Sequence, residues 1–167
     1  MADTVGFIGL GVMGRPMARH VLAKGHAVVA FNRSRVALED FVAAGAQPAV
    51  SPADVARRAN IIITMVSDTP DVEAVIEGPD GVLEGMHTGA VVIDMSSISP
   101  GATKRLAQLV AARGGTMLDA PVSGGDVGAK NAALSIMIGG DKDVVAAVQP
   151  VFECMGKKIG RASCRER

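Results

Sequence analysis

The stretch VGFIGLGVMGRPM, residues 5–17, constrains the fold of this chain more than any other. An apolar run leads into Gly9, Gly11 and Gly14, which form the pattern G-x-G-x-x-G. In this pattern the first glycine permits a tight turn, the second lets a pyrophosphate approach the backbone, and the third lets the following helix pack closely on the strand. The positive end of that helix faces the anion. The pattern therefore predicts a strand, a turn and a helix that bind a dinucleotide.

Glycines also occur at this spacing in ordinary turns, so a purely structural turn is the alternative. The surrounding sequence favours a binding site. Strands are expected at Thr4–Ile8 and Ala27–Phe31, with a helix over residues 13–24 between them. A dinucleotide site requires such a strand–helix–strand unit of about thirty residues.

Apolar runs and helical stretches alternate along the rest of the chain. Further strands are expected at residues 61–66, 90–93, 116–120 and 134–140, and further helices at 36–44, from Ser51, near Asp71, from Ser99 to Arg113 and at 143–155. We expect Lys130 and Asn131 in a loop, and Lys157 and Lys158 in a turn before a last strand. The strands are apolar on both faces, so helices should cover both sides of the sheet. The order predicts an α/β fold, a doubly wound Rossmann-type domain with a mainly parallel sheet.

Composition excludes several classes of function. Seventeen basic and seventeen acidic residues cancel, which argues against a nucleic-acid or membrane-surface partner. The start MADT has neither the basic flank nor the apolar run of a secretory signal. Cys154 and Cys164 match no metal-ligand spacing, so we expect no metal site and two reduced thiols in a cytoplasmic protein.

The residues after the second strand, FNRSR, indicate which dinucleotide is bound. NAD-binding domains place an acid there to bind the ribose 2′-hydroxyl, whereas a nearby arginine accommodates a 2′-phosphate. This chain has Asn32 at the position of the acid, with Arg33 and Arg35 beside it. NADP(H) is therefore the preferred cofactor, and NAD remains possible. The alternative is that both arginines belong to a solvated helix start.

Three motifs in register resemble the β-hydroxyacid dehydrogenase family. They are GFIGLGVMGRPMA, DMSSISP and LDAPVSGGDVGA, and the resemblance runs from about Val5 to about Ile159. The family includes 3-hydroxyisobutyrate dehydrogenases, tartronate semialdehyde reductases, glyoxylate/succinic semialdehyde reductases and, more distantly, 6-phosphogluconate dehydrogenases. The resemblance implies an NAD(P)-dependent oxidoreductase that interconverts a small β-hydroxyacid and its semialdehyde by hydride transfer.

The resemblance also implies the residues of the site. Those at the pyrophosphate are Gly9, Leu10, Gly11, Val12, Met13 and Gly14; those at the adenosine ribose and its phosphate are Asn32, Arg33 and Ser34; those on the ribose side are Met65 and Val66; those near the nicotinamide are Ser96 and Ser97; and those at the substrate carboxylate are Ser123, Gly124 and Gly125. The residues themselves agree for the last group, because PVSGG follows a strand and its glycines permit a nest of N–H donors for a small anion. A plain helix cap is the alternative for Ser123.

The family supplies its catalytic lysine from a G-x-x-x-K-x-x-x-N helix beyond this region, followed by an all-helical domain. This sequence ends GRASCRER and contains no such pattern. We therefore expect a dinucleotide-binding domain over residues 1–160, a tail of non-native appearance over 161–167, no catalytic residue in the chain and no turnover. A non-catalytic NADP(H)-binding sensor or interaction module is the alternative. Apolar surface that a helical domain would cover should lie in residues 134–140 and 144–155 and make the chain self-associate.

Overall fold

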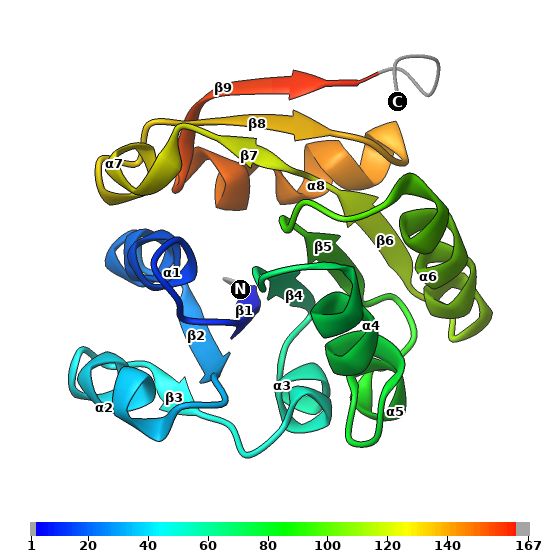
Figure 1. Cartoon of the computed structure of the whole chain (residues 1–167), viewed down its shortest axis with the longest axis horizontal. Coiled ribbons are helices and arrows are strands. Elements are labelled where there is room, and N and C mark those ends of the chain that lie inside the picture. Colours follow the sequence, from blue (N-terminus) through cyan, green and yellow to red (C-terminus); the bar gives the residue numbers. More distant parts are fainter. Residues whose placement is uncertain (1–2, 163–167) are drawn as a thin grey trace.

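A computed structural model describes residues 3–162 of the chain. Its first half contains β1 (Thr4–Ile8), α1 (Gly14–Ala23), β2 (Ala27–Phe31), α2 (Arg35–Ala43), β3 (Gln47–Pro48), α3 (Pro52–Arg58), β4 (Ile61–Thr64) and α4 (Thr69–Glu77). Its second half contains α5 (Val82–Gly85), β5 (Val91–Asp94), α6 (Pro100–Ala112), β6 (Thr116–Asp119), β7 (Val122–Ser123), α7 (Gly125–Lys130), β8 (Leu134–Ile138), α8 (Lys142–Glu153) and β9 (Gly156–Arg161). Strand and helix alternate as the sequence predicts, except where α5 follows α4 and β7 follows β6 (Figure 1).

Six strands form one parallel sheet in the order β3-β2-β1-β4-β5-β6. The chain builds outwards from β1 in one direction and then, from β4, in the other. Beside β1 and β4 the loops after the two strands therefore lead to opposite sides, which opens a crevice at the carboxyl ends of the strands. The predicted doubly wound Rossmann-type fold is confirmed.

Successive residues of the strands enter two different cores. Phe7 and Ile63 pack into the core that contains residues of α1, α2 and α8. Ile8 and Ile62 pack into the core that contains residues of α3, α4 and α6. Since side chains alternate along a strand, the three consecutive isoleucines of β4, Ile61–Ile63, require a helical layer on each face.

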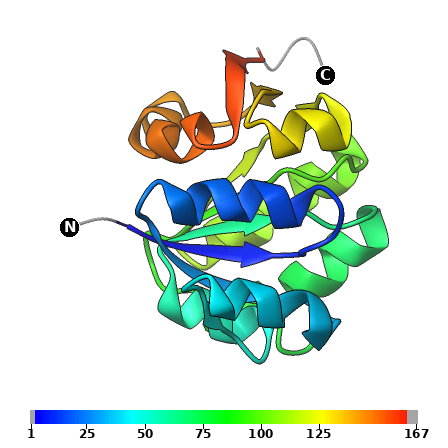
Figure 2. The same ribbon diagram turned by 90° about the vertical axis from the view of Figure 1, so that its left-hand side faces the viewer.

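A second sheet of three strands, β7-β8-β9, lies beyond α1 at one end of the molecule (Figures 1 and 2). The sequence predicts a strand at residues 134–140, which includes β8, but does not predict a second sheet. In the described part of the chain, β6 and β8 are linked by an isolated bridge between Asp119 and Gly139. Strand β8 pairs with β7 in antiparallel and with β9 in parallel orientation.

Two short segments also differ from the sequence prediction. Lys130 ends α7 and Asn131 is its C-cap, because a helix of six residues is too short to show an apolar period. Lys157 and Lys158 lie in β9 rather than in a turn. Charged side chains are tolerated there because β9 is the edge strand of its sheet.

The carboxyl-terminal helix is more buried than the sequence suggests. Val145, Val148, Val151 and Phe152 of α8 are all buried in the core, so the expectation of exposed apolar surface in residues 144–155 is wrong. The four residues share one helix face, which packs against the main sheet and β8. In residues 134–140, by contrast, Met137 is 49% exposed.

The tail expected at residues 161–167 begins inside an element, because Arg161 is the last residue of β9. The rest of that tail from residue 163 onwards, with Cys164, lies outside the described residues. Within residues 3–162, no helix combines the length and the apolar character needed to cross a bilayer.

Candidate functional site

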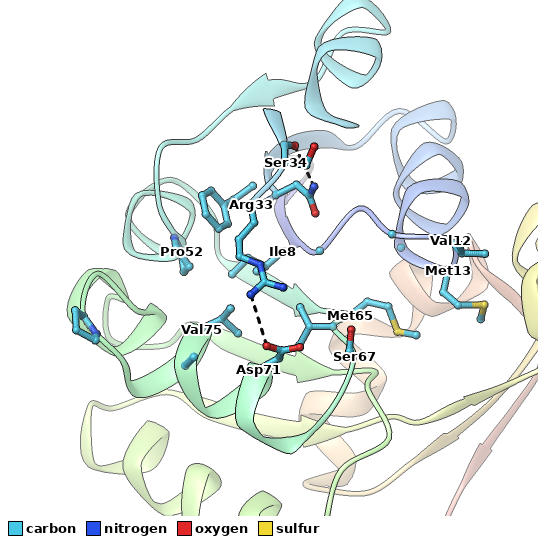
Figure 3. A pocket seen from close by; sticks show the side chains of 18 residues that line it. Ile8, Val12, Met13, Arg33, Ser34, Pro52, Met65, Ser67, Asp71 and Val75 are labelled. Carbon is cyan, nitrogen blue, oxygen red and sulfur yellow. Dashed lines mark hydrogen bonds and ion pairs between the residues drawn. The ribbon is translucent and has the colours of Figure 1, made fainter. Parts of the chain in front are cut away.

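A cleft of about 830 Å³ lies at the carboxyl ends of β1, β2 and β4, beside the point where the strand order reverses (Figure 3). It is lined by Ile8, Gly9, Gly11, Val12, Met13, Gly14, Phe31, Asn32, Arg33, Ser34, Pro52, Met65, Val66, Ser67, Asp71, Ala74, Val75 and Pro79. The structure thus brings together most of the residues predicted for the cofactor. Leu10, Ser96 and Ser97 do not line the cleft, and neither do the three residues predicted for the substrate.

The three glycines of the turn serve two different purposes. Gly9 has φ +100°, and a Cβ there would collide with the carbonyl oxygen of Met65. A Cβ on Gly14 would collide with the carbonyl oxygen of Gly9. A Cβ on Gly11 would meet nothing within 4 Å, although Gly11 lines the cleft. Gly9 and Gly14 are therefore needed to close the turn, whereas Gly11 leaves its backbone open to a ligand, and this opening fits a pyrophosphate.

Asn32 connects the glycine turn to the end of β2. Its Oδ1 accepts a hydrogen bond from the backbone N–H of Leu10 at 2.9 Å, and its Nδ2 donates to the carbonyl oxygen of Ser34 at 3.0 Å. Both ends of the amide are thus used inside the protein. Leu10 is buried, so it shapes the cleft through this bond rather than by contact with a ligand.

Arg33 reaches from the loop after β2 toward the opposite side of the cleft (Figure 3). Its side chain is 87% exposed, and its guanidinium Nη1 lies 3.9 Å from a carboxylate oxygen of Asp71. Asp71 stands in the first turn of α4, a helix capped by the side chain of Asp68. The sequence predicts a helix near Asp71 but not that this carboxylate lines the cleft.

Ser96 acts on the cleft through the backbone of Val66. Its hydroxyl accepts a hydrogen bond from the Val66 N–H at 3.0 Å, and its own N–H donates to Oδ1 of Asp94 at 3.1 Å. The Thr64 hydroxyl donates to the same Oδ1 at 2.9 Å. This network joins the ends of β4 and β5. Ser97, the next residue, is exposed.

Asp94 is the buried anionic member of that network. Burial raises the pKa of its carboxyl group to about 6, because loss of water disfavours the charge more than the bonds from Thr64 and Ser96 favour it. The nearby Asp119 raises the pKa further. Thr64 and Asp94 are functional candidates that the sequence prediction misses. Their signal is positional, since each is the last residue of a parallel strand.

The residues predicted for the substrate carboxylate lie on the second sheet. Ser123, at the end of β7, lines a separate groove of about 530 Å³ on the β7-β8-β9 sheet. Gly124 and Gly125 have φ of +133° and +60°, and α7 begins at Gly125 with Gly124 as its N-cap. Ser123 is therefore not the cap of this helix, and that alternative is wrong. All three residues are exposed.

His20 of α1 connects this helix to α7, which begins at the last of the residues predicted for the substrate. Its Nε2 lies 3.0 Å from the carbonyl oxygen of Ala129 and 2.9 Å from that of Lys130, both in α7. Carbonyl oxygens only accept, so Nε2 carries the proton and donates to both. Among the described residues, no group of three histidine, cysteine or acidic side chains could hold a metal ion.

Comparison with known proteins identifies the family. Residues 4–163 match the family model described as the NAD binding domain of 6-phosphogluconate dehydrogenase. The chain belongs to the β-hydroxyacid dehydrogenase family. It corresponds to the amino-terminal, NAD-binding domain of these oxidoreductases.

Three proteins illustrate the similarity. The 2-hydroxy-3-oxopropionate reductase of Escherichia coli (strain K12) is 45% identical over 155 residues, which are 93% of this chain and 53% of that protein. A structure of Mycobacterium tuberculosis 3-hydroxyisobutyrate dehydrogenase with L-serine superposes with a TM-score of 0.89 at 34% identity, covering 97% of this chain and 56% of the other. A structure of Psf3 in complex with NADP+ and 2-OPP superposes with a TM-score of 0.91 at 30% identity, covering 96% and 57%. The chain therefore spans about half the length of the relatives it matches.

Proposed function

We propose that this chain is the cofactor-binding domain of an NADP(H)-dependent oxidoreductase that interconverts a small β-hydroxyacid and its semialdehyde. The observation that carries the proposal is the open backbone at Gly11, in a cleft that Arg33 overhangs. An anion-binding turn beside a basic side chain suits a dinucleotide that carries an additional phosphate. The names of the two dehydrogenase and reductase relatives support the substrate class.

The preference for NADPH rests on the residues after β2. Asn32 places no carboxylate near the ribose 2′-position, and its amide is held by Leu10 and Ser34. Arg33 offers a guanidinium that can bind a phosphate in a bidentate manner. The similar structure of Psf3 in complex with NADP+ supports the same choice.

The chemistry divides between the cofactor and the protein. A nicotinamide cofactor supplies the hydride when it is bound. For this chain we propose that the backbone at Gly11 binds the pyrophosphate, that Arg33 and Ser34 bind the ribose phosphate, and that Ser123, Gly124 and Gly125 bind the substrate carboxylate. The lysine implied by the resemblance is not in this sequence, so residues 1–160 are proposed to bind cofactor without turning over substrate.

Two further proposals concern the surroundings of the protein. The free thiol of Cys154 is consistent with a reducing compartment, and we place the protein in the cytoplasm. Copies of the chain are proposed to associate through the exposed face of the β7-β8-β9 sheet, where Met137 lies.

Titration with NADPH and with NADH, followed by nicotinamide fluorescence, tests the proposed function. The chain contains neither Trp nor Tyr, so protein emission interferes little. We expect saturable binding of both cofactors, with NADPH bound more tightly. Failure to bind either would refute the dinucleotide site, and equal affinities would refute the preference. A turnover assay of the same sample with tartronate and methylmalonate semialdehydes should show little reduction.

A further inference from the structure

The cleft contains one acid and one base among its lining residues, and the two face each other. Arg33 follows β2 on one side, and Asp71 lies in the first turn of α4 on the other. Figure 3 shows the ion pair between them crossing the cleft. We propose that Asp71 lowers the preference of this cleft for NADPH over NADH, because it competes with the 2′-phosphate for Arg33. The inference rests on the dinucleotide binding proposed above.

The position of the pair makes the competition direct. Nη1 of Arg33 lies 3.9 Å from Oδ1 of Asp71, so a phosphate that binds the guanidinium also approaches the carboxylate. A phosphate monoester carries about −1.5 to −2 charges at neutral pH, and Asp71 adds a like charge on the other side of the same guanidinium. A ligand with a 2′-phosphate must therefore displace Asp71 from Arg33 or bind close to it.

NADH is not subject to this repulsion, because it has no 2′-phosphate. It presents a neutral 2′-hydroxyl at the same place, and a hydroxyl can donate a hydrogen bond to a carboxylate. The repulsion from Asp71 therefore falls on NADPH alone. In a cleft without an acid after β2, Asp71 supplies from α4 the carboxylate that other dinucleotide-binding domains place at the end of β2.

The opposite role for Asp71 would be to orient Arg33 toward the phosphate. The geometry argues against it. The Arg33 side chain is 87% exposed and its contact with Asp71 is a single one at 3.9 Å, so the pair does not fix the guanidinium. Exposed ion pairs of this kind contribute little to rigidity. Orientation of Arg33 and competition for it predict opposite changes in NADPH affinity when Asp71 loses its charge.

The test is the substitution Asp71→Asn, which removes the charge and keeps the shape. At low ionic strength the dissociation constant for NADPH should fall about three- to tenfold, as expected for two like charges separated by several ångströms near water. The dissociation constant for NADH should rise or stay within about twofold. Both constants are measured by the same fluorescence titration.

Glu73→Gln is the matched control. It removes the same charge from the same helix, but Glu73 does not line the cleft and pairs with Arg105 at 2.7 Å. Its NADPH-to-NADH ratio should equal that of the unaltered chain. A ratio that shifts as much as in Asp71→Asn would overturn the inference, because a general charge effect of α4 would then suffice.

Two further measurements separate the possible results. The gain in Asp71→Asn should shrink as salt is added, since salt screens the repulsion. It should also be smaller in an Arg33→Ala background, where the competition for the guanidinium is gone and only the direct repulsion between Asp71 and the phosphate remains. An NADPH affinity that is unchanged or lower in Asp71→Asn overturns the inference, while the unaltered chain's own binding of NADPH still supports the proposed function. Absence of binding by the unaltered chain overturns both.

Discussion

At the scale of single residues, Asp94 and Arg33 represent two opposite uses of charge. Asp94 is buried at the end of β5, and it organises backbone and hydroxyl groups behind the cleft wall. Arg33 is exposed and can move to meet a ligand. A charge kept from water affects stability, whereas a charge at the mouth of a cleft affects binding.

Asp94→Asn should change how the free energy of unfolding depends on pH. The fold raises the pKa of Asp94 from 3.8 to about 6, so the native state holds this proton more firmly than the unfolded chain does. The contribution of the Asp94 proton to the free energy of unfolding is fully present below about pH 4 and is lost as the pH rises to about 6. The loss amounts to about 3 kcal/mol at most. Asparagine does not titrate and still accepts from Thr64 and Ser96, so urea unfolding from pH 4 to 7 should show a flatter curve.

Asp141→Asn is the control for that series. Asp141 caps α8, and bonds from the Val144 and Asp143 N–H groups lower the pKa of its carboxyl group. The stability linked to Asp141 is therefore present above the ordinary carboxyl pKa and is lost toward acidic pH, opposite in direction to that of Asp94, and asparagine keeps the cap. This variant should retain the decline between pH 4 and 6. If Asp94→Asn retained it equally, the decline would have another origin.

Arg33→Ala should weaken NADPH and leave NADH within about twofold. A charge-assisted hydrogen bond contributes about 1.5–3 kcal/mol, and the exposure of Arg33 places its effect at the lower end, about tenfold in affinity. Titration of both cofactors measures it. Arg35→Ala serves as the comparison, because Arg35 is two residues away and does not line the cleft. Equal losses for NADPH and NADH would show that Arg33 does not recognise the 2′-phosphate.

At the scale of elements, the turn between β1 and α1 contains two glycines that the fold requires and a third that is proposed to serve binding. Gly9 and Gly14 lie where any side chain would collide with backbone, whereas a Cβ on Gly11, which lines the cleft, would meet no protein atom within 4 Å. Sequence spacing alone does not distinguish these two purposes. The structure makes the distinction testable with the same substitution at two positions.

Gly14→Ala should destabilise the fold, because its Cβ would overlap the carbonyl oxygen of Gly9 and the turn would have to shift. Losses of several kcal/mol are typical of such strain. Gly11→Ala should change the unfolding free energy by less than about 1 kcal/mol, yet lower the affinity for both cofactors, since its methyl group would lie at the position proposed for the pyrophosphate. Urea unfolding and cofactor titration of both variants provide the data. Normal NADPH binding by Gly11→Ala would contradict the proposed placement of the pyrophosphate.

The elements that the sequence predicts are those with local signals. Ser51 and Ser99 cap α3 and α6 through their hydroxyl groups, each followed by proline at the first helical position. The apolar run of β4 likewise identifies a strand covered on both faces. The two-residue β3 and the four-residue α5 are too short for any period, and sequence analysis does not predict them.

The residues of the candidate site likewise divide into those that a local sequence signal predicts and those that it does not. The glycine turn and the residues after β2 are contiguous in sequence, and their motif predicts their place in the cleft. Asp71 lines the cleft because α4 is oriented so that its first turn places this carboxylate near Arg33. That orientation depends on how Val72 and Ile76 pack beneath the helix, which is a property of the tertiary structure.

At the scale of the whole molecule, the two sheets differ in how completely they are covered. The main sheet has a helical layer on each face, with one core on either side. On the β7-β8-β9 sheet, α8 belongs to the core that contains Ile136, while Met137 points to the exposed side. The groove on this sheet is also lined by Val122 and Ile159.

We expect the chain to self-associate through this face, since its net charge of zero provides little repulsion. Met137→Lys should lower the average mass measured by light scattering across a concentration series. Val36→Lys is the control, because Val36 is 73% exposed but lies on α2, away from the groove. A monomer at every concentration in the unaltered chain would contradict the prediction.

The residues of the cleft all come from the first part of the chain, between Ile8 and Pro79. Translation proceeds at about 5–20 residues per second, so the ribosome completes this part several seconds before the last strand. The strands made by then, β3-β2-β1-β4, are already neighbours in the final sheet. Until β5 has emerged from the ribosome and paired, however, β4 is an open edge whose residues Ile61–Thr64 are all buried in the final fold. The nascent chain is therefore most prone to aggregate at the stage when its nucleotide-binding half is finished and this edge is still unpaired.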